Sequence, residues 1–242
     1  TIKCILNLIR RDAGEITLLG YDNIREERPA KQDIGLVLDE CFFPVALRPL
    51  DVGKTLAPAY REWDQKLFRD YLGKFGLPEK KLIKEFSRGM KMKLSLSAAL
   101  AHRPKLLILD EATAGLDPVV RDEILDEFLG FIQDEDHAIL MSSHITSDLE
   151  KVADYIAYIH QGQVVLSDAK DNILDSYGRV GCTAAQLETI DRADVLRTRK
   201  GAFGCEALVA DRAAFSRKYP MLLVERTTLE DIMLFVGKGE EK

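Results

Sequence analysis

The sequence predicts an α/β protein with a parallel sheet, followed by a smaller α+β region. Three short apolar runs, residues 34–38, 106–109 and 138–141, predict strands, and the run at 106–109 is consistent with a central parallel strand. Longer segments with apolar residues at helical spacing separate these runs. After about residue 175 the apolar runs become shorter, and strand-like and helical patterns alternate. The first part therefore predicts strands alternating with helices, and the last part a small α+β appendage.

Length and composition limit the function classes. The chain has 242 residues, enough for one large domain or one and a half smaller ones. Its 46% apolar and 31% charged residues are ordinary for a soluble globular protein. A net charge of −6 without a basic block gives no case for nucleic-acid binding. No apolar run approaches the roughly 18 residues that span a bilayer, and no secretory leader is visible. A role at a membrane would therefore need another chain to supply the span. The four scattered cysteines fit a reduced cytosolic compartment.

Helix and strand signals can be followed along the chain. Residues 1–9 have one apolar side and predict a helix that ends near residues 12–14. A strand at 15–19 and a turn at 20–23 come next. The later part of the chain predicts helices at 51–61, 64–76, 118–133 and 146–152, a hairpin of 155–159 with 164–166, and helices near 212–218 and 228–236.

The central stretch of the chain joins a helix N-terminus to a strand that ends in two acids. Ser87 is a good N-cap, and Gly89 would let a ligand approach the backbone closely. The helix that follows is apolar over most of its circumference, which predicts burial, and Pro104 ends it. Asp110 and Glu111 directly follow the next strand. They are expected at the carboxyl edge of the sheet, where open α/β proteins bind their ligands.

Four motifs of this chain stand in the order and spacing of one family. They are Ser87-Arg88-Gly89-Met90, the acidic pair Asp110-Glu111, the segment 114–117, and His144 after Met-Ser-Ser. With these motifs the chain resembles the ABC-type ATPases, the nucleotide-binding subunits of ATP-binding-cassette transporters. It looks most like the ATPases of bacterial ABC-2-type exporters, and the resemblance covers about residues 1–170.

The resemblance implies a domain organisation. Residues 1–175 would form a P-loop NTPase-like ABC ATPase domain. Within it, a helical subdomain at about residues 45–103 would present the signature motif, Ser87 to Met90. Residues 176–242 would form the small C-terminal α+β region, in which no catalytic constellation is visible.

The resemblance also implies a role for each motif. Asp110 would hold Mg²⁺, through water, and Glu111 would act as general base on the attacking water. His144 would hydrogen-bond the γ-phosphate and sense hydrolysis. Two such ATPases pair head to tail in the family, so the signature motif would face the γ-phosphate held by the partner. Asp117, in the D-loop (residues 114–117), would hold that loop against the partner subunit.

Some positions depart from the family's pattern. Arg88 stands where glycine is usual, and an arginine there either pairs with phosphate or points to solvent. Asp39 stands where the family usually has the glutamine of its Q-loop. An aspartate can ligate Mg²⁺ directly or through water, and the alternative is a solvated loop acid. The apolar residues 41–47 that follow would be a docking patch if exposed, and core if buried.

The family's phosphate-binding loop, G-x-x-x-x-G-K-[ST], does not occur in the sequence. By alignment its lysine would precede Thr1 with two residues between, so Thr1 is not expected to ligate magnesium. Either the chain was recorded without its N-terminus, or the protein lacks the loop. The first explanation is favoured, because a sheet without that strand would leave apolar faces unmatched. We expect this chain by itself neither to bind ATP tightly nor to hydrolyse it.

The function implied by the resemblance is ATP binding and hydrolysis in an ABC exporter, with ATP and Mg²⁺ as cofactors. The partners would be a transmembrane permease subunit and a second ATPase, identical or different. The location would be cytoplasmic, peripheral on the inner face of the cell membrane. Two alternatives remain open. One is a soluble ABC protein acting on ribosomes or DNA, against which the single signature and the lack of heptads argue. The other is a non-catalytic regulator built on a degenerate cassette.

Overall fold

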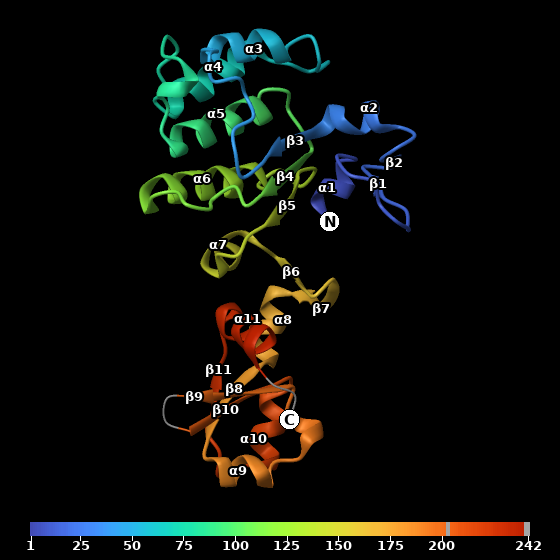
Figure 1. Cartoon of the computed structure of the whole chain (residues 1–242), viewed down its shortest axis with the longest axis vertical. Helices are drawn as coiled ribbons and strands as arrows, with labels where there is room; N and C mark the ends of the chain where they lie inside the picture. Colours follow the sequence, from blue (N-terminus) through green and yellow to red (C-terminus); the bar gives the residue numbers. More distant parts are fainter. Residues whose placement is uncertain (202–203, 240–242) are drawn as a thin grey trace. The chain divides into compact units, whose positions relative to one another are not determined.

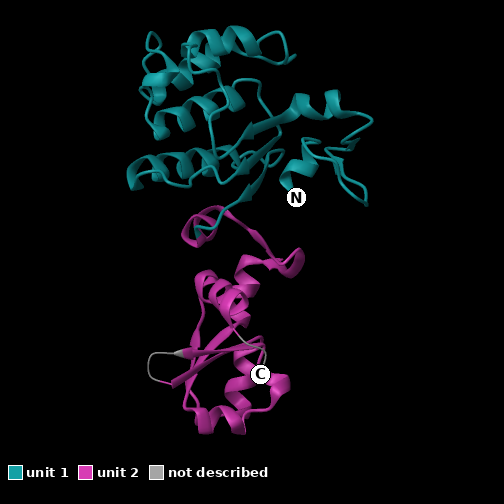
Figure 2. Cartoon of the chain, viewed as in Figure 1, with its two compact units in different colours: residues 1–145 teal, residues 146–242 magenta. Residues whose placement is uncertain are grey.

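The computed structural model describes residues 1–201 and 204–239. The chain divides into two compact units, residues 1–145 and 146–242, which Figure 2 colours separately. The first unit holds a parallel sheet with helices around it, and the second an antiparallel sheet with helices. The predicted α/β fold with an α+β appendage is therefore confirmed.

A three-stranded parallel sheet forms the centre of the first unit. Its strands β3 (Ile34–Val37), β4 (Leu106–Asp110) and β5 (Ala138–Ser142) lie in the order β3-β4-β5. All three predicted strands are confirmed. The middle strand β4 is buried at Leu107, Ile108 and Leu109, as a central parallel strand requires. Because the strands run in the same direction, their carboxyl ends meet at one edge.

Helices pack beside this sheet and on one another (Figure 1). They are α3 (Pro49–Leu56), α4 (Gln65–Lys74), the short η2 (Ile83–Glu85), α5 (Arg88–Leu100) and α6 (Pro118–Phe131). Helix α3 ends earlier than the predicted 51–61, because Pro58 has no backbone N–H to continue the helical hydrogen bonds. Gly53-Lys54-Thr55 matches the last three positions of the G-x-x-x-x-G-K-[ST] loop, but it lies inside helix α3. A Cβ on Gly53 would come within 2.8 Å of the Phe68 ring. That glycine therefore permits helix packing and is not part of a phosphate loop.

The N-terminal region differs from the prediction. Helix α1 (Ile2–Ile5) is much shorter than residues 1–9, because the backbone turns into a left-handed conformation at Asn7, with φ of 55°. The predicted strand at 15–19 is reduced to β1 (Thr17–Leu18). It pairs around Gly20 with β2 (Tyr21–Asp22), which was predicted as part of the turn. The short helices α2 (Glu27–Ala30) and η1 (Lys31–Asp33) then lead into β3.

His102 is a buried histidine just beyond the end of α5. Its Nε2 lies 3.0 Å from the carbonyl oxygen of Ile34, so this nitrogen carries the proton and donates. The ring stacks on Tyr60 with centroids 3.9 Å apart. Burial lowers the pKa of His102 below its usual value. The neutral imidazole is therefore the form that the fold accommodates.

This pKa shift predicts a pH dependence of stability. The unfolded chain takes up a proton at His102 near pH 6.5, whereas the folded chain takes it up only at lower pH. Stability is therefore fully present above about pH 6.5 and falls below it, by at most about 1.4 kcal/mol per pH unit. Urea unfolding followed by the fluorescence of Trp63, the chain's one tryptophan, measures this slope. His102→Gln should flatten it, and an unchanged slope would contradict the assignment.

The second unit contains a four-stranded antiparallel sheet in the order β11-β8-β10-β9. Its strands are β8 (Gly178–Cys182), β9 (Arg197–Gly201), β10 (Gly204–Val209) and β11 (Val224–Arg226). One core, centred on Val180, Ala207 and Phe215, lies where the short helices pack on this sheet. These helices are α9 (Ala184–Thr189), η3 (Arg192–Asp194) and α10 (Arg212–Lys218).

A second core joins helix α11 (Leu229–Lys238) to the segment that precedes the sheet. In it Ile232 and Phe235 pack with Leu149 and Ile156. The elements of this segment are α7 (Thr146–Val152), β6 (Tyr155–His160), β7 (Gln163–Ala169) and α8 (Lys170–Ser176), of which β6 and β7 form the predicted hairpin. The division into two compact units therefore places residues 146–175 with the C-terminal region. The sequence analysis placed these residues in the ATPase domain. Where the ATPase domain itself ends stays a prediction.

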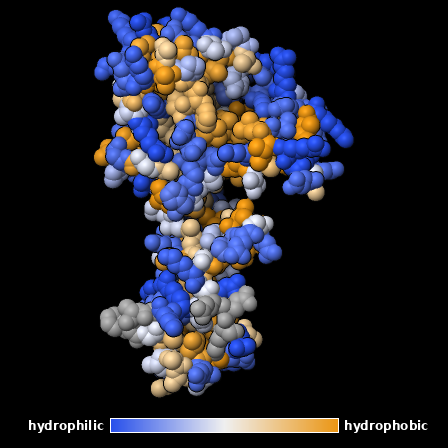
Figure 3. Space-filling model, in the orientation of Figure 1, coloured by the Kyte–Doolittle hydropathy of each residue, from blue (hydrophilic) through white to orange (hydrophobic). Residues whose placement is uncertain are grey.

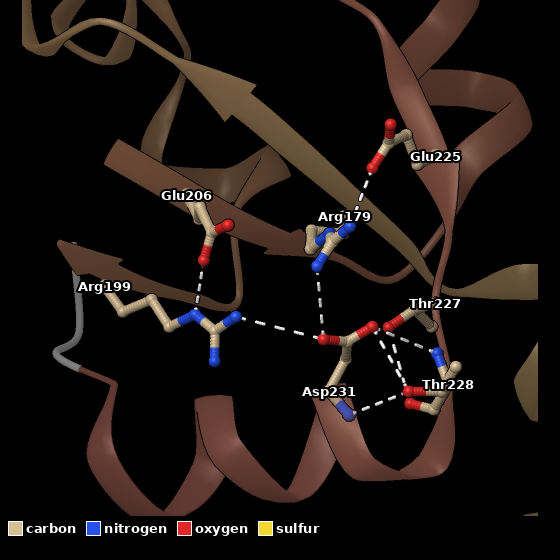
Figure 4. A network of polar contacts seen from close by, with 7 residues as sticks. All are labelled: Arg179, Arg199, Glu206, Glu225, Thr227, Thr228 and Asp231. Atoms are coloured by element: carbon tan, nitrogen blue, oxygen red, sulfur yellow. Dashed lines mark hydrogen bonds and ion pairs between the residues drawn. The ribbon is translucent and has the colours of Figure 1, made fainter. Parts of the chain in front are cut away.

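Helix α11 is also held by ion pairs, which Figure 4 shows from close by. Asp231 lies 3.4 Å from Nη1 of Arg179 and 3.9 Å from Nη2 of Arg199. The same carboxylate accepts from the backbone N–H of Thr228, whose hydroxyl caps Asp231 in return. Arg199 also lies over the ring of Phe235, 4.6 Å from its centroid. One acid therefore both completes the capping box of the helix and binds it to two strands.

Asp231→Ala should destabilise the second unit by about 1–3 kcal/mol, because it removes the carboxylate half of the capping box and both ion pairs. The loss is limited because Arg179 keeps Glu225 and Arg199 keeps Glu206. Hydrogen exchange of the α11 amides measures the effect. Glu230→Ala, at the exposed neighbouring position of the same helix, is the matched control and should change stability by less than about 0.5 kcal/mol. Equal losses in the two variants would refute the role of Asp231.

Candidate nucleotide site

The carboxyl edge of the parallel sheet brings together Asp110, Glu111 and Ser142. The pairing of β4 with β5 sets Asp110 directly beside Ser142. The Ser142 hydroxyl donates to Oδ1 of Asp110 over 2.6 Å. The backbone N–H of Glu111 points to the carbonyl oxygen of Ser142 at 3.1 Å and to its hydroxyl at 3.2 Å. Strand register therefore fixes the direction of the first carboxylate and the backbone position of the second.

Glu111 and His144 form a close pair at this edge. Nδ1 of His144 lies 2.6 Å from Oε2 of Glu111. The histidine side chain is 66% exposed and the glutamate side chain 33% exposed, so the pair is open to a ligand. Glu111 also has a positive φ of 52°, uncommon for a residue with a side chain. Such strain tends to occur at functional sites.

The signature motif begins helix α5. As predicted, Ser87 is the N-cap, and its hydroxyl accepts the N–H of Met90 over 3.2 Å. Ser87 and Arg88 are exposed, Met90 is half-buried and Gly89 is buried. A Cβ on Gly89 would lie 3.0 Å from a methyl group of Val120 on α6. Gly89 therefore lets two helices pack closely, and the predicted approach of a ligand to its backbone stays a prediction.

Arg88 and Asp117 both lie at the D-loop. The Arg88 guanidinium rests on Gly115, where a Cβ would lie 3.0 Å from its Nη1. Neither of the two predicted orientations of Arg88, toward phosphate or simply into solvent, included this contact. The exposed Asp117 caps α6, accepting the N–H of Val120 over 3.1 Å. Its role at a partner subunit stays a prediction.

Asp39 lies in an exposed loop beyond the end of β3. In the part of the chain that the structure describes, no three His, Cys, Asp or Glu side chains are placed to hold a metal ion. Asp39 and Asp110 therefore do not belong to a ready-made protein cage. Mg²⁺ usually takes only one or two carboxylates and completes its ligands with water and phosphate oxygens. Asp110 with the Ser142 hydroxyl fits that chemistry, and a role for Asp39 stays a prediction.

The loop at residues 41–47 is exposed in part. The side chains of Phe42 and Val45 are 70% and 56% exposed, whereas Phe43 and Leu47 are half-buried. Two large apolar side chains thus face solvent close to the Q-loop position. Of the two readings in the sequence analysis, the exposure favours the docking patch. Figure 3 shows hydrophobic residues gathered on the visible face of the first unit.

Comparison with known proteins decides the family. The family model for ABC transporters matches residues 1–114. The lantibiotic transport ATP-binding protein SrtF of Streptococcus pyogenes is 33% identical, and the match covers 70% of this chain and 73% of SrtF. The chain belongs to the ABC transporter ATP-binding proteins. The linearmycin resistance ATP-binding protein LnrL of Bacillus subtilis is 34% identical, over 77% of this chain and 61% of LnrL. This ABC protein thus spans about 61% of LnrL and 55% of the bacitracin transport ATP-binding protein BcrA of Bacillus licheniformis.

Solved structures support the same assignment. The ATP-binding subunit of an ABC transporter superposes with a TM-score of 0.62 at 25% identity, covering 71% of this chain and 73% of that one. A dimeric ATP-binding cassette with bound ADP and phosphate superposes with a TM-score of 0.61 at 18% identity, and covers 69% of this chain and 78% of that one, which shows the fold. Among the described residues, no helix is long and apolar enough to cross a membrane.

Sequence reasoning missed Ser142 as a member of the site. The Met-Ser-Ser that precedes His144 was visible, but only the register of β4 with β5 sets its first serine beside Asp110. Sequence reasoning also missed the contact of Arg88 with Gly115. The Ala-Gly-Leu-Asp run was recognised, but the packing of α5 against α6 was not, and that packing brings the two segments together.

Proposed function

We propose that this ABC protein hydrolyses ATP and powers a separate membrane subunit of an exporter. The observation that carries the proposal is the 2.6 Å pair of Glu111 with His144 beside Asp110. ATP hydrolysis needs the phosphate charge neutralised, a water in line with the γ-phosphate, and a group that takes the proton of that water. One sheet edge of this chain supplies Asp110, which would hold the neutralising Mg²⁺, and Glu111, which would take the proton of the water.

In the proposed mechanism, the Glu111 carboxylate accepts the proton from the attacking water. His144 holds that carboxylate in place by donating from Nδ1, and its other ring nitrogen would donate to the γ-phosphate only in the imidazolium form. Asp110, oriented by Ser142, would hold Mg²⁺ through water. When bound, that ion neutralises charge that develops on the phosphate oxygens. The phosphates themselves require backbone N–H groups and a lysine that the 242 residues do not supply as a phosphate loop.

The same proposal includes a dimer of ATPase domains. Ser87 is exposed at the N-terminus of the 13-residue helix α5, where the helix dipole favours an anion. In a head-to-tail pair, this end would face the γ-phosphate on the partner ATPase, which is either a second copy or a different chain. A dimeric cassette among the similar structures supports this arrangement.

A membrane partner is also part of the proposal. Phe42 and Val45 form an exposed apolar patch that suits docking to a permease subunit on the inner face of the cell membrane. The names of the relatives, which refer to linearmycin resistance and to bacitracin and lantibiotic transport, support an exporter. They give no basis for naming the molecule that this protein would move.

The test is Mg²⁺-dependent ATPase activity in a version of the protein that carries a phosphate-binding loop upstream of Thr1. We expect turnover that EDTA abolishes and that excess Mg²⁺ restores. Phe42→Ser should leave this activity unchanged while reducing copurification with the permease subunit. Absence of turnover in the extended protein would refute the ATPase. Unchanged copurification of the Phe42→Ser variant would refute the docking patch alone.

A further inference from the structure

The D-loop of this chain is bracketed by two arginines from different helices. From α5, the Arg88 guanidinium lies on Gly115, with Nη1, Cζ and Nε all within 3.4 Å of where a Cβ would be. From α6, Nη2 of Arg121 approaches the carbonyl oxygen of Leu116 at 3.5 Å. Gly115 also has a φ of 66°, so a side chain there would be strained even without Arg88.

The helix that carries Arg88 is firmly held at this end. Gly89 packs on Val120 of α6, as described above. One turn further on, Lys93 forms an ion pair with Glu123 of the same helix α6. The lysine side chain is largely buried, so solvent screens this pair less than an ordinary surface pair. Arg88 therefore projects from a helix end that is fixed on α6. Its contact with Gly115 can restrain the D-loop.

The D-loop continues directly from the candidate catalytic glutamate. The backbone N–H of Ala114 donates to the carbonyl oxygen of Glu111 over 3.0 Å, which closes a tight turn. Glu111 itself holds the positive φ of 52° in this turn. A strained residue keeps its conformation only when its surroundings fix it. A shift of Gly115 would thus be passed through three residues to the backbone of Glu111.

We propose that Arg88 is a positioning residue that holds the D-loop of its own chain and, through it, the Glu111 turn. This inference rests on the proposed ATPase function. It assigns to Arg88 a contact within the chain rather than a bond to phosphate on the partner. The contact uses the flat guanidinium on a glycine, so lysine, which carries the same charge on a different shape, does not replace it.

The first test measures the contact without any nucleotide. Hydrogen–deuterium exchange of the amides in residues 111–117 is followed in this 242-residue chain and in Arg88→Ala. We expect these amides to exchange about threefold faster or more in the variant. Arg69→Ala is the matched control, because it removes an exposed arginine from α4. Equal exchange of the D-loop amides in the two variants would overturn the proposal.

The second test uses ATPase kinetics in the version that carries the phosphate loop. Arg88→Ala should lower kcat about tenfold or more, because the reacting groups are misplaced, and change KM for MgATP by less than about twofold. Arg88→Lys should not restore kcat. Restoration of kcat by Arg88→Lys, or a change confined to KM, would indicate that residue 88 acts through its positive charge on a phosphate group. Either result would overturn the proposal.

The two tests separate the failure of this inference from that of the proposed function. If the parent protein has no ATPase activity, the proposed function fails, and the catalytic part of the inference fails with it. If the parent is active and exchange rises in Arg88→Ala without loss of kcat, the ATPase stands and the positioning role is overturned. Only faster exchange together with a lysine-resistant loss of kcat supports the inference.

Discussion

Glu111→Gln is expected to lower kcat for ATP hydrolysis by about 10²–10⁴-fold, the range found when a general base is lost. Glutamine has nearly the same shape and can still contact His144, but it cannot take the proton of the attacking water. The backbone turn at Glu111, with its N–H directed to Ser142, does not depend on the carboxylate. MgATP binding by the extended protein should therefore change little.

Single-turnover hydrolysis beside calorimetric binding measures both halves of this prediction. Glu79→Gln, an exposed position with the same chemical change, is the matched control and should leave both quantities unchanged. Near-normal hydrolysis by Glu111→Gln would mean that another group activates the water. Loss of MgATP binding together with loss of hydrolysis would instead mean that Glu111 contributes to nucleotide binding.

His144→Ala is expected to produce the second largest loss, about 10²-fold in kcat, because it releases the carboxylate of the proposed general base Glu111. The 2.6 Å contact between the two side chains predicts that their effects overlap. The double variant with Glu111→Gln should therefore be little worse than Glu111→Gln alone.

Steady-state ATPase assays of the single and double variants measure this overlap. His160→Ala, at the end of strand β6, is the control histidine and should retain normal turnover. If the losses for His144 and Glu111 simply multiplied, the two residues would act independently. That result would contradict the role of His144 in holding the carboxylate.

The sequence predicted the elements that rest on local patterns. Ser87 was recognised at a helix start because a capping residue acts within one turn, and its hydroxyl accepts the expected backbone N–H. Strand β4 was recognised because a run such as Leu-Leu-Ile-Leu is typical of a central parallel strand, and its centre is fully buried. The positions of Asp110 and Glu111 at a strand end followed from it.

What the sequence did not predict depends on packing between segments. The bond from Ser142 to Asp110 needs the register of two strands far apart in the chain. The burial of Gly89 and the contact of Arg88 with Gly115 need the packing of α5 on α6. The positive φ of Glu111 is a strain that no local propensity favours. Likewise, the grouping of residues 146–175 with the C-terminal region depends on the core around Phe235.

The central claim is that the edge with Asp110, Glu111 and His144 is one part of a MgATP site. Calorimetric titration of MgATP tests it most directly, on this 242-residue chain and on a version extended upstream through a G-x-x-x-x-G-K-[ST] loop. We predict that only the extended protein binds MgATP, because the edge supplies the metal and water side of the site and the loop supplies the phosphate grip. Binding by neither protein, or equal binding by both, would contradict this placement of the site.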